Sequence, residues 1–119
     1  IITFSPNIEI DTIFLTKSTI EINKNITLIS PFSSPIKIKS TTNVTHPMFY
    51  IGQFGTLTLN KINLYAQNHT GEGRVIMNDG KLNLSDVQVV EDTNGTGSAI
   101  LNMKNASIKI NAYNSVIKN

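Results

Sequence analysis

The chain has 119 residues, of which 39% are hydrophobic and only 15% are charged. This length predicts a single domain over residues 1–119, with enough apolar surface to form a core. The net charge of +2 comes from scattered lysines and one arginine rather than a basic stripe, which argues against nucleic-acid binding. The absence of cysteine excludes disulfide frameworks, thiolate metal sites and cysteine nucleophiles.

No apolar run approaches the ~20 residues of a membrane span, so no membrane span is expected. The first ten residues, IITFSPNIEI, also lack the basic-then-apolar plan of a signal peptide. Because the sequence does not begin with Met, we expect it to be a segment of a longer solenoid.

Strand patterns follow one another along the chain. Apolar and polar residues alternate in TIEI (19–22), IKIK (36–39), TLTL (56–59), KLNL (81–84) and SIKI (107–110). Gly, Pro, Asn and Ser interrupt these runs and leave no window for a helical pattern. We therefore expect an all-β fold.

An internal repeat organises these strands. The segment GTLTLNKINLYA (55–66) returns as GKLNLSDVQVVE (80–91) and more loosely as ASIKINAYNSV (106–116). A shorter segment precedes each copy, as MFYI (48–51), VIMN (75–78) and AILN (99–102). Parallel stacking of equivalent strands explains why inward positions match. The matched pairs are Leu57 with Leu82, Leu59 with Leu84, Ile62 with Val87 and Leu64 with Val89; Ile20, Ile22, Ile26 and Leu28 form an earlier, shifted copy.

The inward alternation slips once in each unit, between Leu59 and Ile62, and this slip predicts a corner at Asn60-Lys61. Asn tolerates left-handed backbone geometry, and stacked Asn side chains can bond one another along the axis. The predicted corner and ladder positions are Asn23, Asn60, Ser85 and Asn111.

Period, alternation and corner together predict a right-handed parallel β-helix, a solenoid of about five coils. A β-sandwich is the alternative, but its units need not repeat their inward residues in register.

The order of segments resembles the β-helical domains of bacterial surface proteins, namely the polymorphic outer-membrane-protein repeats and autotransporter passengers. The matching segments are ITFSPNIEIDTIFLT, then STIEINKNITLISP, then F-x-I before GTLTLNKINL, and finally small residues before AILN. The resemblance implies an extracellular or cell-surface solenoid used for adhesion, for matrix building or as a stalk, with no cofactor.

A carbohydrate-active β-helix enzyme, of the polysaccharide lyase or hydrolase type, is the alternative function. Such an enzyme needs acids and a basic residue gathered on one sheet. Here the acids are spread thinly, and EDTNGTG (91–97) lacks the spacing of a calcium loop. We therefore predict no catalytic, cofactor-binding or metal site. The residues weighed for this role are Asp79, Asp86, Glu91, Arg74, His46 and His69.

Asn-x-Ser/Thr triplets make the chain a candidate glycoprotein. If the protein passes through a eukaryotic secretory pathway, these positions are candidate glycan acceptors. They are Asn25, Asn43, Asn68, Asn83, Asn94 and Asn105.

The expected function is a non-enzymatic extracellular module whose coils form a rigid rod with a lateral adhesive surface. The expected partners are further coils of the same solenoid or copies of the chain stacked end to end, which leads to self-assembly. Carbohydrate or another surface protein is the expected lateral partner. A sugar-stacking platform would need several outward aromatic residues on one side; the candidates are Tyr50, Tyr65, Tyr113, Phe32, Phe49 and Phe54.

Overall fold

The computed structural model of the chain describes residues 2–3, 12–15, 19–40, 46–66, 75–91, 99–111 and 116–118. Residues 2–3, 91, 111 and 116–118 are described by their backbone alone. Every regular element in these segments is a β-strand, which confirms the expected all-β class.

The strands form three parallel sheets, called A, B and C here. Sheet A contains β1 (Ile2–Thr3), β4 (Asn25–Ile29), β7 (Thr56–Asn60), β10 (Lys81–Ser85) and β13 (Ser107–Asn111). Sheet B contains β2 (Thr12–Leu15), β5 (Ile36–Ser40), β8 (Ile62–Ala66), β11 (Gln88–Glu91) and β14 (Val116–Lys118). Sheet C contains β3 (Ile20–Ile22), β6 (Phe49–Ile51), β9 (Ile76–Asn78) and β12 (Ile100–Asn102).

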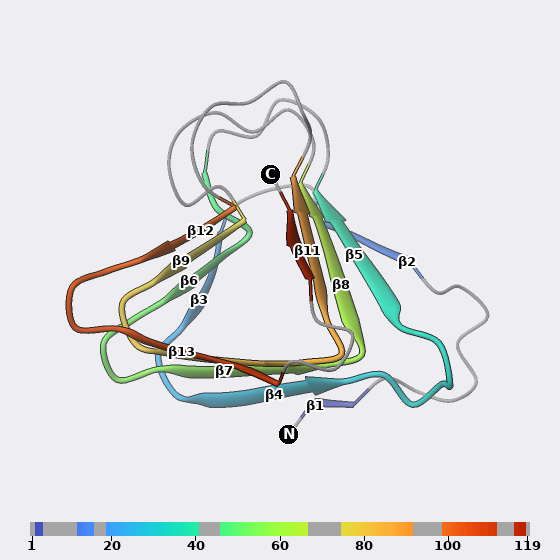
Figure 1. The fold of residues 1–119 in the computed structure, drawn as a ribbon, viewed down its shortest axis with the longest axis horizontal. Coiled ribbons are helices and arrows are strands. Elements are labelled where there is room, and N and C mark those ends of the chain that lie inside the picture. Colours follow the sequence, from blue (N-terminus) through green and yellow to red (C-terminus); the bar gives the residue numbers. More distant parts are fainter. Residues whose placement is uncertain are drawn as a thin grey trace.

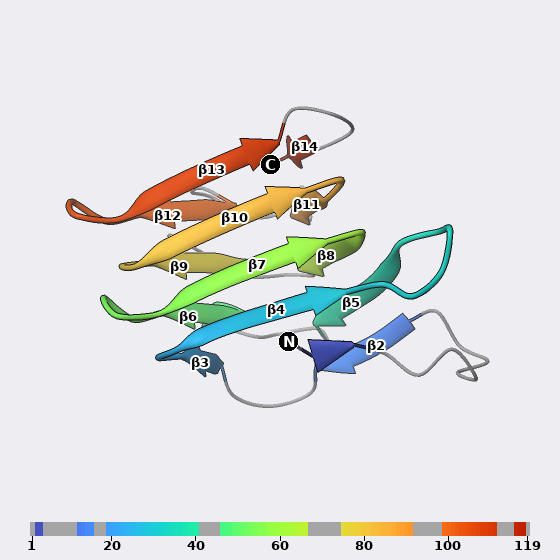
Figure 2. The ribbon, with the colours of Figure 1, turned by 90° about the horizontal axis from the view of Figure 1, so that it is seen from below.

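Successive strands belong to sheets A, B and C in strict rotation. Each strand therefore pairs with the strand that lies three positions earlier in the chain. One passage through A, B and C is called a coil. Figure 1 looks along the stack and shows the three sheets as the sides of a triangle, while Figure 2 shows the strands of sheet A rising in order from β4 to β13. The predicted parallel stacking of repeated strands is therefore confirmed.

Equivalent inward residues stack directly on one another. Leu57 pairs with Leu82, and Leu59 pairs with Leu84, as the repeat predicts. Because each coil fills the same cross-section, these side chains are almost completely buried between the coils above and below. The buried side chains form one apolar cluster that runs through the interior of the stack.

The corner between sheets A and B lies where the slipped alternation predicts it for two coils. Lys61 follows β7 with φ of 57° and Asp86 follows β10 with φ of 54°. The left-handed residue is thus the second of each predicted pair, not Asn60 or Ser85. Backbone bonds tie these corners together, since Lys61 N–H donates to the Ser85 carbonyl at 3.1 Å.

The prediction that Asn23 begins the same corner is wrong. Asn23 and Lys24 lie between β3 and β4, at the corner between sheets C and A. The equivalent of Lys61 in that coil is Ser30, whose N–H donates to the Asn60 carbonyl at 3.1 Å. A longer connection, residues 31–35, then leads to β5, and this insertion conceals the repeat.

At the corner between sheets C and A, Gly55 and Gly80 have no room for a Cβ because the backbones of successive coils touch there, whereas the equivalent positions in the neighbouring coils hold Lys24 and Ala106. A Cβ at Gly80 would overlap the carbonyl oxygens of Gly52 and Gly55, and a Cβ at Gly55 would overlap that of Ile22. These contacts explain why glycine marks the start of the repeated segment.

Candidate interaction surfaces

A ladder of side-chain amides links the end of the third coil to the end of the fourth and to the start of the fifth. Asn78 Nδ2 donates to Asn102 Oδ1 at 2.7 Å and to the Ser107 carbonyl at 3.0 Å. Asn78 Oδ1 accepts from Gly80 N–H at 3.1 Å. Asn78 is fully buried, so these bonds satisfy a polar group that would otherwise be costly to enclose.

This ladder differs from the one that the sequence predicts. Asn60 and Ser85 face each other in sheet A, and Ser85 faces Asn111, but the described bonds at that corner come from the backbone. The amide ladder lies instead at the last residue of the sheet C strands. The recurrence of VIMN and AILN was the signal that could have located it, because both segments end in Asn.

The described glycan acceptors lie on sheet A and beside it. Asn25 begins β4 and is exposed, and Asn105 is exposed in the turn before β13. Asn83 lies in the middle of β10, is half-buried, and donates through Nδ2 to Thr58 Oγ1 at 3.2 Å. Its side chain faces outward as expected, between inward Leu82 and Leu84. Asn43, Asn68 and Asn94 lie outside the described residues.

The outer face of sheet A is largely polar, with two lysines among neutral side chains. Two of its columns of outward residues have one residue on each of β4, β7, β10 and β13. The first contains Asn25, Thr56, Lys81 and Ser107, and the second contains Thr27, Thr58, Asn83 and Lys109.

Sheet B carries a column that combines aromatic and cationic side chains. Phe14, Lys39, Tyr65 and Val90 lie side by side on successive strands. The Lys39 ammonium lies 5.5 Å from the centre of the Tyr65 ring, within the range of a cation–π contact. Phe14 is 62% exposed, so this column offers an apolar lateral surface at its lower end.

Sheet C has one outward residue per strand. These residues form a second lateral column of Glu21, Tyr50, Met77 and Leu101. The aromatic residues are thus distributed over different sides: Tyr65 on sheet B, Tyr50 on sheet C and Phe54, 83% exposed, at the C–A corner. Phe49 is buried in the core and Tyr113 lies outside the described residues. Among the described aromatic residues, no single sugar-stacking platform forms.

The described candidate catalytic residues do not lie together in one site. Asp79 precedes β10 and Asp86 follows it, so the length of a five-residue strand separates them. Nδ1 of His46 is buried with no hydrogen-bond partner among the described residues. The Glu91 side chain, His69 and Arg74 lie outside them. In the part of the chain that the structure describes, no three or more His, Asp or Glu side chains gather as a metal site would require.

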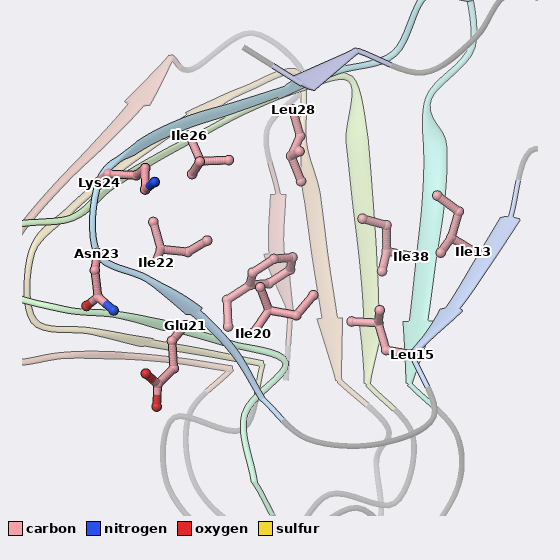
Figure 3. Close-up of a pocket in the computed structure, with 11 residues that line it drawn as sticks. Ile13, Leu15, Ile20, Glu21, Ile22, Asn23, Lys24, Ile26, Leu28 and Ile38 are labelled. Atoms are coloured by element: carbon pink, nitrogen blue, oxygen red, sulfur yellow. The ribbon is translucent and has the colours of Figure 1, made fainter.

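An apolar hollow of about 440 Å³ lies between the first two coils. Figure 3 shows the side chains of Ile22, Ile26 and Leu28 directed toward Ile13, Leu15 and Ile38, with Glu21 and Asn23 pointing away. The aliphatic lining is the beginning of the same core that fills the later coils.

Comparison with family models, curated proteins and solved structures gave no match to this chain. A helix long and apolar enough to cross a membrane is absent from the segments that the structure describes.

Proposed function

We propose that the chain is a right-handed parallel β-helix of about five coils that serves as a non-enzymatic structural and adhesive module. One observation carries the proposal: equivalent strands stack in parallel and in register, with a continuous apolar interior. In such a stack each coil contacts only its neighbours, so adding coils extends the module without changing its cross-section.

The path of the chain supports the right-handed sense. In Figure 1 the chain runs counterclockwise from sheet A through B to C. Figure 2 shows the molecule from below, and in it the later strands lie above the earlier ones. In the orientation of Figure 1, the later strands therefore lie nearer to the viewer. Parallel strands of one sheet are also joined by right-handed crossovers in nearly all proteins.

The outer faces support an adhesive role. Polar columns cover sheet A, while the columns on sheets B and C include apolar and aromatic side chains that partner molecules can contact. The resemblance to bacterial surface-protein repeats supports a location outside the cell or on its surface. The lateral partner we propose is carbohydrate or another surface protein.

Two experiments test this function. Antibodies raised against the purified chain should label intact source cells, and beads coated with the chain should adhere to host surfaces. A double variant, Phe14→Ser with Tyr65→Ser, should lower adhesion severalfold, whereas the matched variant Thr27→Ser with Thr58→Ser on sheet A should retain it. Labelling restricted to permeabilised cells, or release of reducing sugar ends from a polysaccharide panel, would overturn the proposal.

A further inference from the structure

Two cationic side chains share the outer face of sheet B. Lys37 and Lys39 lie two residues apart on β5, so both point to the same side of the sheet. The residue between them, Ile38, is buried in the core. Both lysines therefore face outward, and both are only partly buried.

This face has no carboxylate among its described side chains. Apart from the two lysines, its outward positions hold neutral residues, namely Thr12, Phe14, Asn63, Tyr65, Gln88 and Val90. The described acidic side chains lie elsewhere: Glu21 on sheet C, Asp79 at the C–A corner and Asp86 at the A–B corner. The described part of sheet B is therefore a cationic face and is complementary to an anionic partner.

Aromatic rings lie on both sides of one of these lysines. Lys39 lies between Phe14 on β2 and Tyr65 on β8, in one column that crosses the strands. The Lys39 ammonium is 5.5 Å from the centre of the Tyr65 ring. An ammonium has three donor hydrogens, so contact with one ring leaves donors for an anion. The column thus offers a ring, an ammonium and a second ring in succession.

The spacing of the column favours an extended ligand. Strands of one sheet lie about 4.8 Å apart, so Phe14 and Tyr65, which are two strands apart, are separated by roughly 10 Å along the stack. One sugar ring is too small to contact both side chains. Because Lys39 separates the two rings, they form no continuous stacking platform, and a neutral glycan would contact them only at separate points.

We propose that the column of Phe14, Lys39 and Tyr65 binds an acidic polysaccharide, a polymer of uronic acid residues that lies along the axis of the stack. This inference rests on the proposed function and names the chemical class of its lateral partner. Sugar rings would pack against the two aromatic rings. A carboxylate of the sugar between them would accept a charge-assisted hydrogen bond from Lys39 Nζ. Lys37 would add a second positive charge beside the polymer.

An acidic polysaccharide fits this surface better than a nucleic acid does. Binding of a phosphate backbone relies on many cations placed along its path. The described part of sheet B offers two lysines, both on one strand. A solenoid and a polysaccharide also both repeat along a single axis, so successive sugars can meet successive strands.

The test measures binding of defined oligosaccharides to the full chain by calorimetry in metal-free buffer. The ligands are hexamers of galacturonic, mannuronic and guluronic acid, and the same hexamers after reduction of their carboxyl groups to alcohols. At least one acidic hexamer should bind tenfold more tightly than its reduced form, and added salt should weaken its binding. The matching monosaccharide should bind at least tenfold more weakly than the hexamer, because it cannot reach both rings.

Three variants assign this preference to the column. Lys39→Gln should abolish the preference for the acidic hexamer, whereas Lys39→Arg should retain it. Lys109→Gln removes the same charge from the exposed face of sheet A and should leave both affinities unchanged. Phe14→Leu removes a ring but no charge, so it should weaken the acidic and reduced hexamers by a similar factor of at least threefold.

Failure of every acidic hexamer to bind more tightly than its reduced form would overturn the inference. Equal or tighter binding of a six-residue polyglutamate peptide or of a single-stranded hexanucleotide would also overturn it, because the partner would then be a protein or a nucleic acid. These measurements use the purified chain and soluble ligands. Cell-surface labelling can therefore succeed where glycan binding fails, and the reverse, so the two failures are distinguishable.

Discussion

Asn78 and Asn102 occupy the same position in successive coils, and the amide of the first donates to the amide oxygen of the second at 2.7 Å. The donor is completely buried, whereas the acceptor is exposed. The same residue type in the same register position therefore has different energetic importance, which depends on whether another coil covers it.

Asn78→Leu should lower the free energy of unfolding by about 2–4 kcal/mol, because it leaves the buried Gly80 N–H and the Ser107 carbonyl without their partner. Asn102→Leu should cost less, about 1–2 kcal/mol, because it frees only one hydrogen of the buried Asn78 amide, which keeps its bond to Ser107, and because the exposed Ala106 carbonyl can bond to water. Urea unfolding of both variants measures the difference. Equal losses would contradict the assigned role of burial.

Gly80→Ala should destabilise the protein by about 2–4 kcal/mol, because the new Cβ would overlap backbone oxygens of the preceding coil. Gly52→Ala is the matched control. Its Cβ would lie 2.6 Å from Asn23 Oδ1, an exposed side-chain atom that can rotate away. Thermal unfolding should therefore give a lower melting temperature for Gly80→Ala than for Gly52→Ala. A larger loss of stability in Gly52→Ala would contradict the described spacing of the coils.

Lys61→Gly should stabilise the protein by about 0.5–1 kcal/mol. The left-handed backbone of Lys61 is unfavourable for a residue with a Cβ, and removing this cost outweighs the greater freedom of glycine when unfolded. Asn60→Gly, one residue earlier and inside β7, should instead destabilise by a similar amount. Denaturant midpoints of the two variants should move in opposite directions; a shared direction would refute the corner geometry.

Glycan attachment should distinguish the candidate acceptors. When the chain is secreted from a eukaryotic host, the folded product should carry glycans at Asn25 and Asn105, which are exposed. Asn83 should remain unmodified, because its amide is bonded to Thr58 in the middle of sheet A. Glycopeptide mass spectrometry measures occupancy at each position, and high occupancy at Asn83 would contradict this placement.

The repeat made the parallel arrangement predictable, because Leu57 and Leu82, or Leu59 and Leu84, share an environment that selects the same residue type. The corner at Asn60-Lys61 was predictable from the slipped alternation. The position of Asn23 was not, because the connection over residues 31–35 lengthens one coil and shifts its register with the next.

The amide ladder was harder to predict than the core. Its positions hold Ile22 and Ile51 in the earlier coils and Asn78 and Asn102 in the later ones, so no single residue type marks the column. Backbone contacts at the C–A corner decide which polar atoms the ladder side chains can reach. Those contacts depend on the three-dimensional path of the chain.

The direction of the hydrogen bonds has a mechanical consequence. In each sheet they join one coil to the next, and therefore lie along the axis of the stack. Tension along that axis would load the bonds between successive coils in series, so the weakest junction would part first. The described strands would then peel away one coil at a time, and the material would extend in small steps rather than fracture in a single event.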